Sequence, residues 1–492
     1  MNYKNYINGR WVKTRQTFSS TNPATGEVIG KCFEAGSREV QMAVKSARKA
    51  LAGWRLKPAP KRAEYLLRLG RLLEEHKSEL SRIVTQEMGK VLKEGAGDVQ
   101  ESIDITYYMA GEGRRLFGHQ VPSELANKSA MAVREPVGVC ALITPWNFPT
   151  AIPCWKMMPA LVLGNTVVLK PSSYTSIAAA KIIQLMDEVG FPPGVVNLVL
   201  APGEKVGNAL IKDPDVDLIS FTGSTAVGRK IATTATSLGK RVSLEMGGKN
   251  AIIVMDDGDL DLAVDAILWA AFGTTGQRCT ACSRVLVHQR VKSKLVSRLV
   301  ERAKKLRLGD GLHPKTDVGP VVNAGQLARI HRYVKIGQRE GAKLMCGGRI
   351  RSDGEYKYGY FYEPTVFDNV KPKMRIAQEE IFGPVVAIIS VKDLDEAVRV
   401  NNDTAYGLSS AIFTQDINKA YRAMRDITTG IVYVNAGTTG AEVQLPFGGT
   451  RGTGNGHREA GQAAIDSFSE WKTIYVDYSG KVQRAQIDNY EA

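Results

Sequence analysis

From Gly138 onward, short runs of β-branched and aliphatic residues alternate with segments of helical spacing, and this alternation constrains the fold more than any other feature. Strands joined by crossover helices lie parallel in one sheet. A first series of runs reads GVCALI, TVVLK, VVNLVL and LISFTGS; a second reads AIIVM, RVLVH, VVAIIS, SAIFT and GIVYVN. The pattern predicts an α/β protein with two Rossmann-like parallel-sheet domains that meet near residues 247–250.

The chain before and after this region predicts further elements. Residues 61–88 and 91–113 place apolar side chains at helical spacing, so we expect two amphipathic helices there. Near the end, FSEWKTIYVDYSG reads as a lone strand that needs a sheet, which a neighbouring subunit could supply.

Composition excludes several classes of protein. The 492 residues are 43% hydrophobic and 23% charged, which is typical of a soluble globular chain with more than one core. The first residues, MNYKNYINGRWVKT, lack the apolar core of a secretory signal, and no apolar stretch is long enough to cross a bilayer. The six cysteines are scattered, unlike a disulfide framework. We therefore expect a cytoplasmic protein with no membrane association.

The net charge of +15 raises the question of nucleic-acid binding. However, lysine and arginine alternate with aspartate and glutamate, as in KRAEYLLRLGRLLEEHK, and no zinc-finger or basic-dimer motif occurs. A basic surface that collects anionic small molecules explains the charge better, and we expect no nucleic-acid partner.

Polar residues follow four of the predicted strands, at the sheet edge where parallel sheets bind ligands. Asn147 lies in the PWNFP loop, Lys170 ends TVVLK, and Glu245 ends RVSLE before a Gly-Gly turn. In LISFTGSTAVG, Gly223 and Ser224 precede a helix whose free N–H groups suit a phosphate. Taken singly, each residue also fits a structural role. Neither the Gly-x-Gly-x-x-Gly fingerprint nor a complete triphosphate loop follows these strands, so a dinucleotide site here is atypical.

Cys279 and Cys282 form a Cys-x-x-Cys pair within GTTGQRCTACSR, on a loop between a predicted helix at 259–272 and a strand. A redox pair normally opens a helix, which lowers the pKa of its first thiol, and no helix is predicted here. A structural zinc ion needs four ligands, and the sequence offers neither a second cysteine pair nor paired histidines, so we predict no metal. One nucleophilic thiol or two inert buried cysteines remain.

Six segments together resemble the aldehyde dehydrogenase superfamily: PWNFP, KPSS, FTGSTAVG, LEMGGKN, GQRCTA and QEEIFGPV. They occur in that family's order, and the resemblance covers nearly the whole chain. It implies a discontinuous NAD(P)-binding domain, a catalytic domain, and an oligomerisation element made of a hairpin and a C-terminal strand. The implied boundaries are, in that order, 1–120 with 137–249, then 250–446, then 121–136 with 467–492. Family members are dimers or tetramers, so a homo-oligomer is expected.

The resemblance implies a role for each of three residues in oxidising an aldehyde to the carboxylic acid. Cys279 would attack the aldehyde carbon and form a thiohemiacetal. The Asn147 amide and the Cys279 backbone N–H would stabilise the negative oxygen. Hydride transfer to the nicotinamide would leave a thioester, which water activated by Glu245 would hydrolyse. Cys282 has no part in this scheme and would be a packing residue.

The resemblance also implies a site for NAD or NADP. Its residues would be Ile143, Trp146, Lys170, Ser173, Gly203, Gly223, Ser224, Val227, Glu380 and Phe382. Family members that prefer NAD usually carry Glu three residues after the lysine, where it binds the adenosine ribose, whereas this chain has Ser173. A carboxylate there would repel a 2′-phosphate and a serine beside Lys170 would not. We therefore expect NADP to be accepted, and it could be preferred.

Substrate identity depends on fewer residues. VQESID and TTGAE resemble the branch that oxidises α-aminoadipic semialdehyde, in which Glu101 would bind the amino end of the substrate. The implied substrate residues are Glu101, Arg278, Thr439, Gly440 and Ala441. The guanidinium of Arg278, beside the nucleophile, could reach an acidic substrate, or could form a purely structural ion pair with Glu101. The alternatives are 2-oxoglutarate semialdehyde, succinic semialdehyde and a broad range of aldehydes.

The resemblance leaves two alternatives: a catalytically inactive family member and a CoA-acylating dehydrogenase. A catalytically inactive member would have no reason to keep Cys279, Glu245 and Asn147 together. A CoA-acylating dehydrogenase would pass the acyl group to a thiol, whereas Glu245 favours transfer to water.

Overall fold

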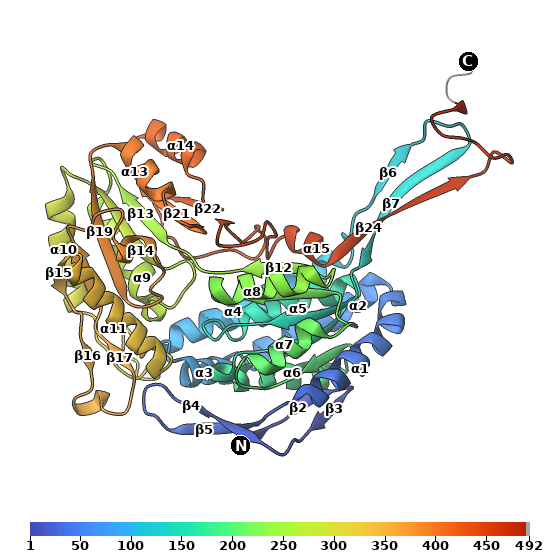
Figure 1. The fold of residues 1–492 in the computed structure, drawn as a ribbon, viewed down its shortest axis with the longest axis horizontal. Helices are drawn as coiled ribbons and strands as arrows, with labels where there is room; N and C mark the ends of the chain where they lie inside the picture. The colour runs from blue at the N-terminus through green and yellow to red at the C-terminus, as the bar shows by residue number, and fades with distance from the viewer. Residues whose placement is uncertain (489–492) are drawn as a thin grey trace.

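The computed structural model describes residues 1–488 and confirms two parallel-sheet cores (Figure 1). The first is a seven-stranded sheet in the order β12-β11-β8-β9-β10-β2-β3. Its strands are β2 (Asn5–Ile7), β3 (Arg10–Val12), β8 (Val139–Ile143), β9 (Thr166–Lys170), β10 (Val196–Leu198), β11 (Leu218–Thr222) and β12 (Arg241–Glu245). Strands β8 to β12 pair in parallel, as the crossover pattern predicts, whereas β2 and β3 add an antiparallel edge.

The second core is a seven-stranded sheet in the order β15-β18-β19-β14-β13-β21-β22. Its strands are β13 (Asn250–Val254), β14 (Cys282–His288), β15 (Lys343–Cys346), β18 (Thr365–Asp368), β19 (Val385–Val391), β21 (Ser409–Phe413) and β22 (Ile431–Val434). All pairs are parallel except the one that β15 makes with β18 at the edge. Each of the nine apolar runs in the sequence contains or overlaps one strand of the two sheets.

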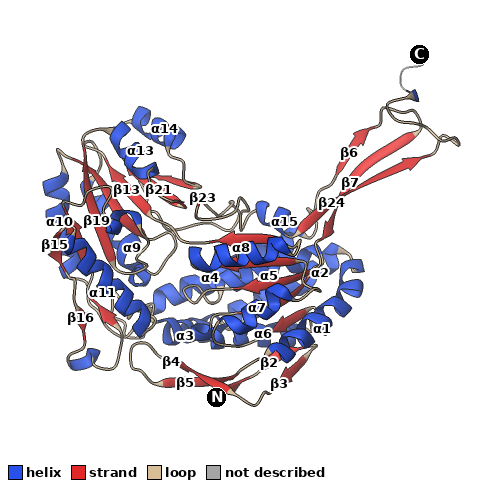
Figure 2. Ribbon diagram, viewed as in Figure 1, coloured by secondary structure: helices blue, strands red, loops and turns tan. Residues whose placement is uncertain are grey.

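Helices lie against both sheets and bury their strands (Figure 2). With the first sheet are α1 (Ser37–Leu56), α2 (Ala59–Glu75), α3 (Lys77–Met88), α4 (Leu92–Glu112), α5 (Ala151–Leu163), α6 (Ser176–Val189), α7 (Glu204–Lys212) and α8 (Thr225–Ser237). With the second are α9 (Leu260–Phe272), α10 (Lys292–Lys304), α11 (Ala324–Arg339), α12 (Arg375–Gln378), α13 (Leu394–Asn402) and α14 (Ile417–Asp426). Because both faces are covered, the inner strands are continuous apolar runs, and every residue of β8 is buried.

The helical region before residue 113 differs from the prediction. The segment 61–88, expected as one helix, divides into α2 and α3 at His76, whose ψ of 8° leaves the helical range. Both halves pack against α4, so apolar spacing continues on either side of the break. Periodicity therefore identified the buried face but not the bend.

Three antiparallel strands form an arm that projects away from both sheets (Figure 1). They are β6 (His119–Pro122), β7 (Lys128–Pro136) and β24 (Ser469–Asp477), and α15 (Ala463–Ser467) leads into the last. Every residue of β24 pairs with β7, from Ser469 opposite Pro136 to Asp477 opposite Lys128. The expectation of a lone C-terminal strand is therefore wrong, because β7 of the same chain satisfies one of its edges.

Short strands complete the fold, and the sequence pattern did not predict them. They are β1 (Asn2–Tyr3), β4 (Thr17–Thr21) and β5 (Val28–Phe33) in one sheet, β16 (Ile350–Arg351) with β17 (Phe361–Tyr362), and β20 (Tyr406–Gly407) with β23 (Thr450–Arg451). Within residues 1–488, no helix combines the length and apolar character that a membrane crossing requires.

Candidate active site

Cys279 lies on a loop where the two sheets meet. The loop follows a short 3-10 turn, Gly273–Gly276, and leads into β14. Within that turn Thr274 and Thr275 both adopt left-handed backbone angles, with φ of 51° and 57°, a strained arrangement that surrounding structure must hold. Asn250, at the start of β13, donates its Nδ2 to the Cys279 carbonyl at 2.7 Å. The thiol is therefore presented by a fixed loop, partly exposed, at the junction of the two cores.

Two cavities meet at Cys279. One, here called the α4 cavity, has a volume of about 220 Å³ and is lined by α4, Glu245 and Trp269. The other, the α8 cavity, has a volume of about 150 Å³ and is lined by the turn before α8 and by Glu380. Both are bounded by Ile152, Thr222, Met246 and Cys279. One sulfur can thus be reached from two sides.

Glu245 ends β12 and lines the α4 cavity. Its Oε1 has no hydrogen-bond partner among residues 1–488. Burial, reinforced by the negative charge of Glu459, raises the pKa of the Glu245 carboxyl well above its usual value. Lys156 opposes this shift, but Lys156 itself forms a buried ion pair with Glu459. Glu245 is consequently a proton-binding carboxyl, not a permanently charged one.

Cys279 and Asn147 complete the group of predicted catalytic residues. Burial, with further contributions from Glu245 and Glu380, raises the pKa of the Cys279 thiol, so a base must remove its proton before attack. Asn147 is buried and donates its Nδ2 to the Gln277 carbonyl at 3.1 Å. That bond fixes the amide next to the cysteine loop, and an amide nitrogen carries a second hydrogen to offer a ligand.

Half of the predicted cofactor residues line the α8 cavity: Trp146, Gly223, Ser224, Glu380 and Phe382. The rings of Trp146 and Phe382 meet edge to face at 5.4 Å. Glu380 accepts the Gly248 backbone N–H at 2.9 Å. A Cβ on Gly247 would lie 2.4 Å from Glu380 Oε2, so the Gly-Gly turn is what allows this carboxyl to sit so close to the backbone.

The other predicted cofactor residues stand at neighbouring strand and helix ends, outside the lining of the α8 cavity. Ile143 at the end of β8 pairs with Lys170 at the end of β9. Burial lowers the pKa of Lys170 to about 8, and its ammonium donates to the Pro171 carbonyl at 3.2 Å. Ser173 begins a short 3-10 helix, and Gly203 is the N-cap of α7 with a φ of +73°.

The turn before α8 offers fewer free N–H groups than the sequence predicts. Ser224 is the N-cap of α8 and accepts the Val227 N–H at 3.5 Å. The N–H of Gly223 donates to the Glu245 carbonyl at 3.0 Å. Two buried hydroxyls nearby have no partner among residues 1–488, those of Thr222 and Thr225. Orphaned polar atoms beside a helix N-terminus suit a polar, anionic ligand.

All five predicted substrate residues line the α4 cavity: Glu101, Arg278, Thr439, Gly440 and Ala441. Arg278 does not pair with Glu101, however. It donates Nη2 to Glu94 at 3.1 Å and Nε to Thr274 at 2.9 Å. The interpretation of Arg278 and Glu101 as a structural ion pair is therefore wrong. Arg278 pairs instead with Glu94, which lies about two helical turns closer to the start of α4.

Glu101 consequently has no cationic partner of its own among residues 1–488. Burial, with repulsion from Asp98, raises the pKa of its carboxyl to about 8. Near neutral pH the group is mostly protonated, and it can then donate a hydrogen bond as well as accept one. This is a neutral polar position in the wall of the α4 cavity.

Among the residues that line the site, Glu94, Trp269 and Glu459 were not predicted from the sequence. A signal for the first existed, because Glu94, Asp98 and Glu101 follow the spacing of one helical face. Trp269 lies in a predicted apolar helix, where a tryptophan is expected to be a core residue. Glu459, in a loop far along the chain, reaches the site only through tertiary structure.

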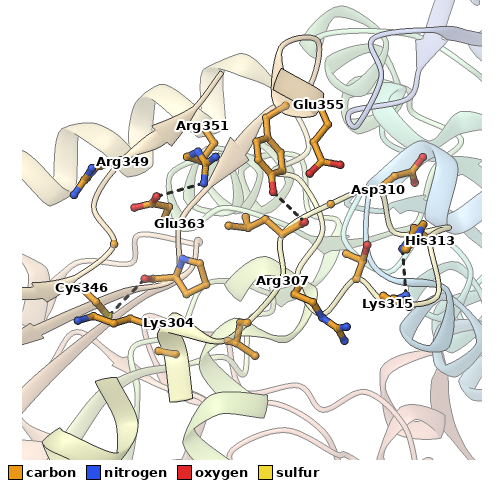
Figure 3. Close-up of a pocket in the computed structure, with 18 of the residues that line it drawn as sticks. Lys304, Arg307, Asp310, His313, Lys315, Cys346, Arg349, Arg351, Glu355 and Glu363 are labelled. Carbon is orange, nitrogen blue, oxygen red and sulfur yellow. Dashed lines mark hydrogen bonds and ion pairs between the residues drawn. The ribbon is translucent and has the colours of Figure 1, made fainter. Parts of the chain in front are cut away.

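A larger cavity, of about 850 Å³, lies elsewhere, between the loop after α10 and the segment that carries β15 and β16. None of the predicted site residues lines it. Figure 3 shows Arg351 facing Glu363, and Arg351 is also held by Asp353 at 2.9 Å. With Arg307 paired to Asp317 beside it, most of the arginine charge here is already neutralised. Size alone therefore does not mark the active site.

Two parallel-sheet cores meet at a single thiol, with a buried carboxyl on one side and a turn that begins a helix on the other, an arrangement suited to an α/β enzyme. The chain belongs to the aldehyde dehydrogenase family, which it matches over residues 11–474. The resemblance of its six segments is thus confirmed, and the protein is an enzyme that acts on aldehydes.

Similar proteins cover almost the full chain. It is 44% identical over 479 residues to the alpha-ketoglutarate semialdehyde dehydrogenase of Haloferax volcanii, spanning 96% of this chain and 99% of that one. It is 42% identical over 477 residues to the alpha-ketoglutaric semialdehyde dehydrogenase of Bacillus subtilis, spanning 96% and 98%. The structure of Staphylococcus aureus betaine aldehyde dehydrogenase in complex with NAD⁺ has a TM-score of 0.95 at 35% identity, spanning 98% and 96%.

Proposed function

We propose that the protein oxidises an acidic semialdehyde to the corresponding acid, with 2-oxoglutarate semialdehyde as its preferred substrate. The sequence alone favours α-aminoadipic semialdehyde and gives 2-oxoglutarate semialdehyde as the alternative. The two relatives named above are semialdehyde dehydrogenases for α-ketoglutarate, another name for 2-oxoglutarate, and their similarity over the whole chain supports the alternative.

One observation carries the acidic-substrate proposal. Arg278 and the hydroxyl of Thr439 line the same cavity as Cys279. The Thr439 hydroxyl is buried and has no partner among residues 1–488. Arg278 uses Nε and Nη2 within the protein, and a guanidinium has five N–H donors in all. Donors of this kind, kept in a cavity without an acceptor, suit a carboxylate or a ketone.

The state of Glu101 supports the choice between the two semialdehydes. Recognition of the α-amino group of α-aminoadipic semialdehyde is strongest with an anionic carboxylate at this position. Because the pKa of Glu101 is raised to about 8, an ammonium would first have to displace a proton there near neutral pH. A protonated Glu101 can instead donate a hydrogen bond to the 2-oxo group or the carboxylate of 2-oxoglutarate semialdehyde.

In the proposed mechanism, Cys279 Sγ attacks the aldehyde carbon and its proton leaves to a neighbouring base. The second hydrogen of the Asn147 amide and the Cys279 N–H stabilise the oxygen that becomes negative. A bound nicotinamide dinucleotide would supply the hydride acceptor that oxidation of an aldehyde needs. Glu245, unpartnered in the α4 cavity, takes a proton from the water that releases the acid from Cys279.

The chain's own residues fit a dinucleotide in the α8 cavity. The turn at Gly223 and Ser224 begins a helix beside orphaned hydroxyls, and Glu380 is held by the Gly-Gly turn close to Cys279. The same assignment places Lys170 and Ser173 at the adenosine end, and a serine there leaves room for a 2′-phosphate. We therefore include both NAD and NADP as acceptors.

The arm of β6, β7 and β24 supports self-association. Its exposed apolar residues include Val121, Trp471, Tyr475, Val476 and Tyr478. Large apolar side chains on a projecting sheet suit contact with a second copy of the chain. Sedimentation or light scattering of the purified protein should give a dimer or tetramer, and a monomer at micromolar concentration would exclude this part of the proposal.

Initial rates of the purified protein test the function. We expect kcat/KM for 2-oxoglutarate semialdehyde to exceed that for α-aminoadipic semialdehyde and for propanal, with either NAD or NADP as acceptor. A preference for propanal would exclude an acidic substrate. A requirement for CoA during turnover would show that the acyl group passes to a thiol and not to water.

A further inference from the structure

We propose that Lys93, in the first turn of α4, is a substrate-specificity residue that binds the carboxylate at the end of the semialdehyde opposite the aldehyde group. This inference deepens the function proposed above and rests on it. Lys93 lines the α4 cavity together with Cys279, and it is an exposed residue.

The charges around the α4 cavity are otherwise compensated within the protein. Arg278 pairs with Glu94 at 3.1 Å. Asp98 pairs with Lys90 at 3.0 Å, with both side chains fully buried. A third pair joins Glu459, which lines the cavity, to Lys156.

The two remaining lining carboxyls, Glu101 and Glu245, both bind protons readily because burial raises their pKa values. Of the two cations that line this cavity within residues 1–488, Lys93 and Arg278, only Lys93 forms no ion pair. The acidic group that it influences is Asp317, and Asp317 already pairs with Arg307 at 3.0 Å. An anionic substrate would supply the missing counter-charge.

The position of Lys93 is also unfavourable for the helix itself. The first turn of a helix carries the positive end of the dipole, so an anion stabilises it and a cation does not. Lys93 stands there next to Glu94, whose charge is already used by Arg278. The helix dipole therefore does not favour a lysine at this position, and a bound anion would offset that cost.

Trp269 lies against both Lys93 and Arg278, and Arg278 is the cation that the sequence analysis predicts to be a substrate residue. The Lys93 ammonium lies 5.8 Å from the centre of the indole ring, and the Arg278 guanidinium carbon lies 4.6 Å from it. Both cations thus stand against one aromatic side chain that is 45% exposed. Arg278 is anchored by Glu94 and Thr274, whereas the lysine has a flexible stem that can move to a ligand.

Three variants at one position test the inference with 2-oxoglutarate semialdehyde and propanal as paired substrates. Lys93→Gln should raise KM for the acidic substrate about fivefold, which is the effect of losing one exposed ion pair, with kcat nearly unchanged. Lys93→Glu should raise it further, and Lys93→Arg should restore it to within about twofold of the original protein. KM for propanal should not move in any of the three.

The matched control is Lys294→Gln. Lys294 is likewise an exposed lysine in the first turn of a helix, α10, but it lines neither the α4 nor the α8 cavity. The same charge is lost, so any change in KM that this variant shares with Lys93→Gln reflects net charge alone. The effect of Lys93→Gln should also shrink as salt is raised, because an exposed charge is screened.

The outcomes separate the two proposals. If the unmodified protein does not prefer 2-oxoglutarate semialdehyde to propanal, the proposed function fails. If it does prefer the acidic substrate but Lys93→Gln leaves both KM values unchanged, or raises them equally, the function stands and the role of Lys93 is overturned. Selective loss for the acidic substrate with rescue by Lys93→Arg supports both.

Discussion

The α8 and α4 cavities meet at one sulfur but are built in different ways. The α8 cavity is bounded in part by turns at strand ends, where Gly247 and Gly248 bring the carboxyl of Glu380 close to the backbone. The α4 cavity is made from side chains of distant elements, held by ion pairs such as that of Arg278 with Glu94. Backbone positions keep a geometry that many sequences can share, whereas paired side chains can change with the substrate.

Substitution of Cys279, which lines both cavities, should have the largest effect on activity. Cys279→Ala should lower aldehyde oxidation by at least about 1,000-fold with every substrate and either dinucleotide, because the covalent route is lost. Formation of reduced nicotinamide measures it. Cys282→Ala is the control: that thiol is buried at the start of β14, and its replacement should leave most of the activity. A Cys279→Ala protein that retained a tenth of the rate would contradict the common role of this sulfur.

The second largest effect should be on stability, which substitutions in the two cavities should lower by different amounts. Glu94→Leu leaves the buried Arg278 guanidinium unpaired and should cost about 3–5 kcal/mol of unfolding free energy. Removing both charges, with Glu94→Leu and Arg278→Leu together, should recover much of the loss. On the α8 side, Ser224→Ala removes only a helix cap and should cost about 1 kcal/mol.

Urea unfolding curves of the unmodified protein, the two single variants and the double variant give the unfolding free energies for this comparison. Equal losses for Glu94→Leu and Ser224→Ala would mean that the α4 cavity does not depend on its ion pair more than the α8 cavity depends on its cap. A double variant as unstable as the single one would show that packing, and not charge, is what the pair contributes.

The difference in construction also explains what could be predicted from the sequence. Both sheets were predictable because a buried strand is a local run of apolar residues, and strand ends such as Asn147 and Glu245 follow from those runs. The division of α2 from α3 at His76 was not, since the apolar spacing continues across it. The pairing of Arg278 with Glu94 depends on how α4 packs beside the cysteine loop, which no local pattern encodes.

The family resemblance identified site residues in loops, which hydrophobic periodicity could not identify. The loops that carry Cys279, Glu380 and Thr439 have no distinctive local pattern, and only their likeness to known motifs marked them as site residues. Glu459 and Lys93 had neither signal. Glu459 approaches Glu245 from a loop more than 200 residues away, and Lys93 becomes conspicuous only when its neighbours are seen to be paired.

Cofactor preference tests the proposed adenosine end of the dinucleotide site, which lies outside the lining of the α8 cavity. Ser173→Glu places a carboxylate where the 2′-phosphate of NADP is proposed to lie, and like charges repel. We expect kcat/KM with NADP to fall at least tenfold while the value with NAD stays within about threefold. Ser173→Gln, similar in size but uncharged, is the control and should change the ratio much less. An equal loss with both dinucleotides would place position 173 away from the 2′ oxygen.

The smallest expected effect is a shift in the pH profile of kcat, and it concerns the α4 cavity. The negative charge of Glu459 raises the pKa of Glu245, and the positive charge of Lys156 lowers it. A general base works only when deprotonated, so the acid limb of kcat should follow the pKa of Glu245. Changing either neighbour therefore moves that limb in a predictable direction.

Glu459→Gln removes the group that raises the pKa of Glu245, so the acid limb of kcat should move to lower pH. Lys156→Met removes the group that lowers it, so the limb should move to higher pH. Both changes also break the buried ion pair of Lys156 with Glu459, so stability and plateau rates should fall in both variants. Opposite shifts of the acid limb would identify Glu245 as the titrating base, because the broken pair is common to both variants. Rate profiles from pH 5 to 9 are the measurement, and shifts of the same sign would assign the limb to another group, such as the Cys279 thiol.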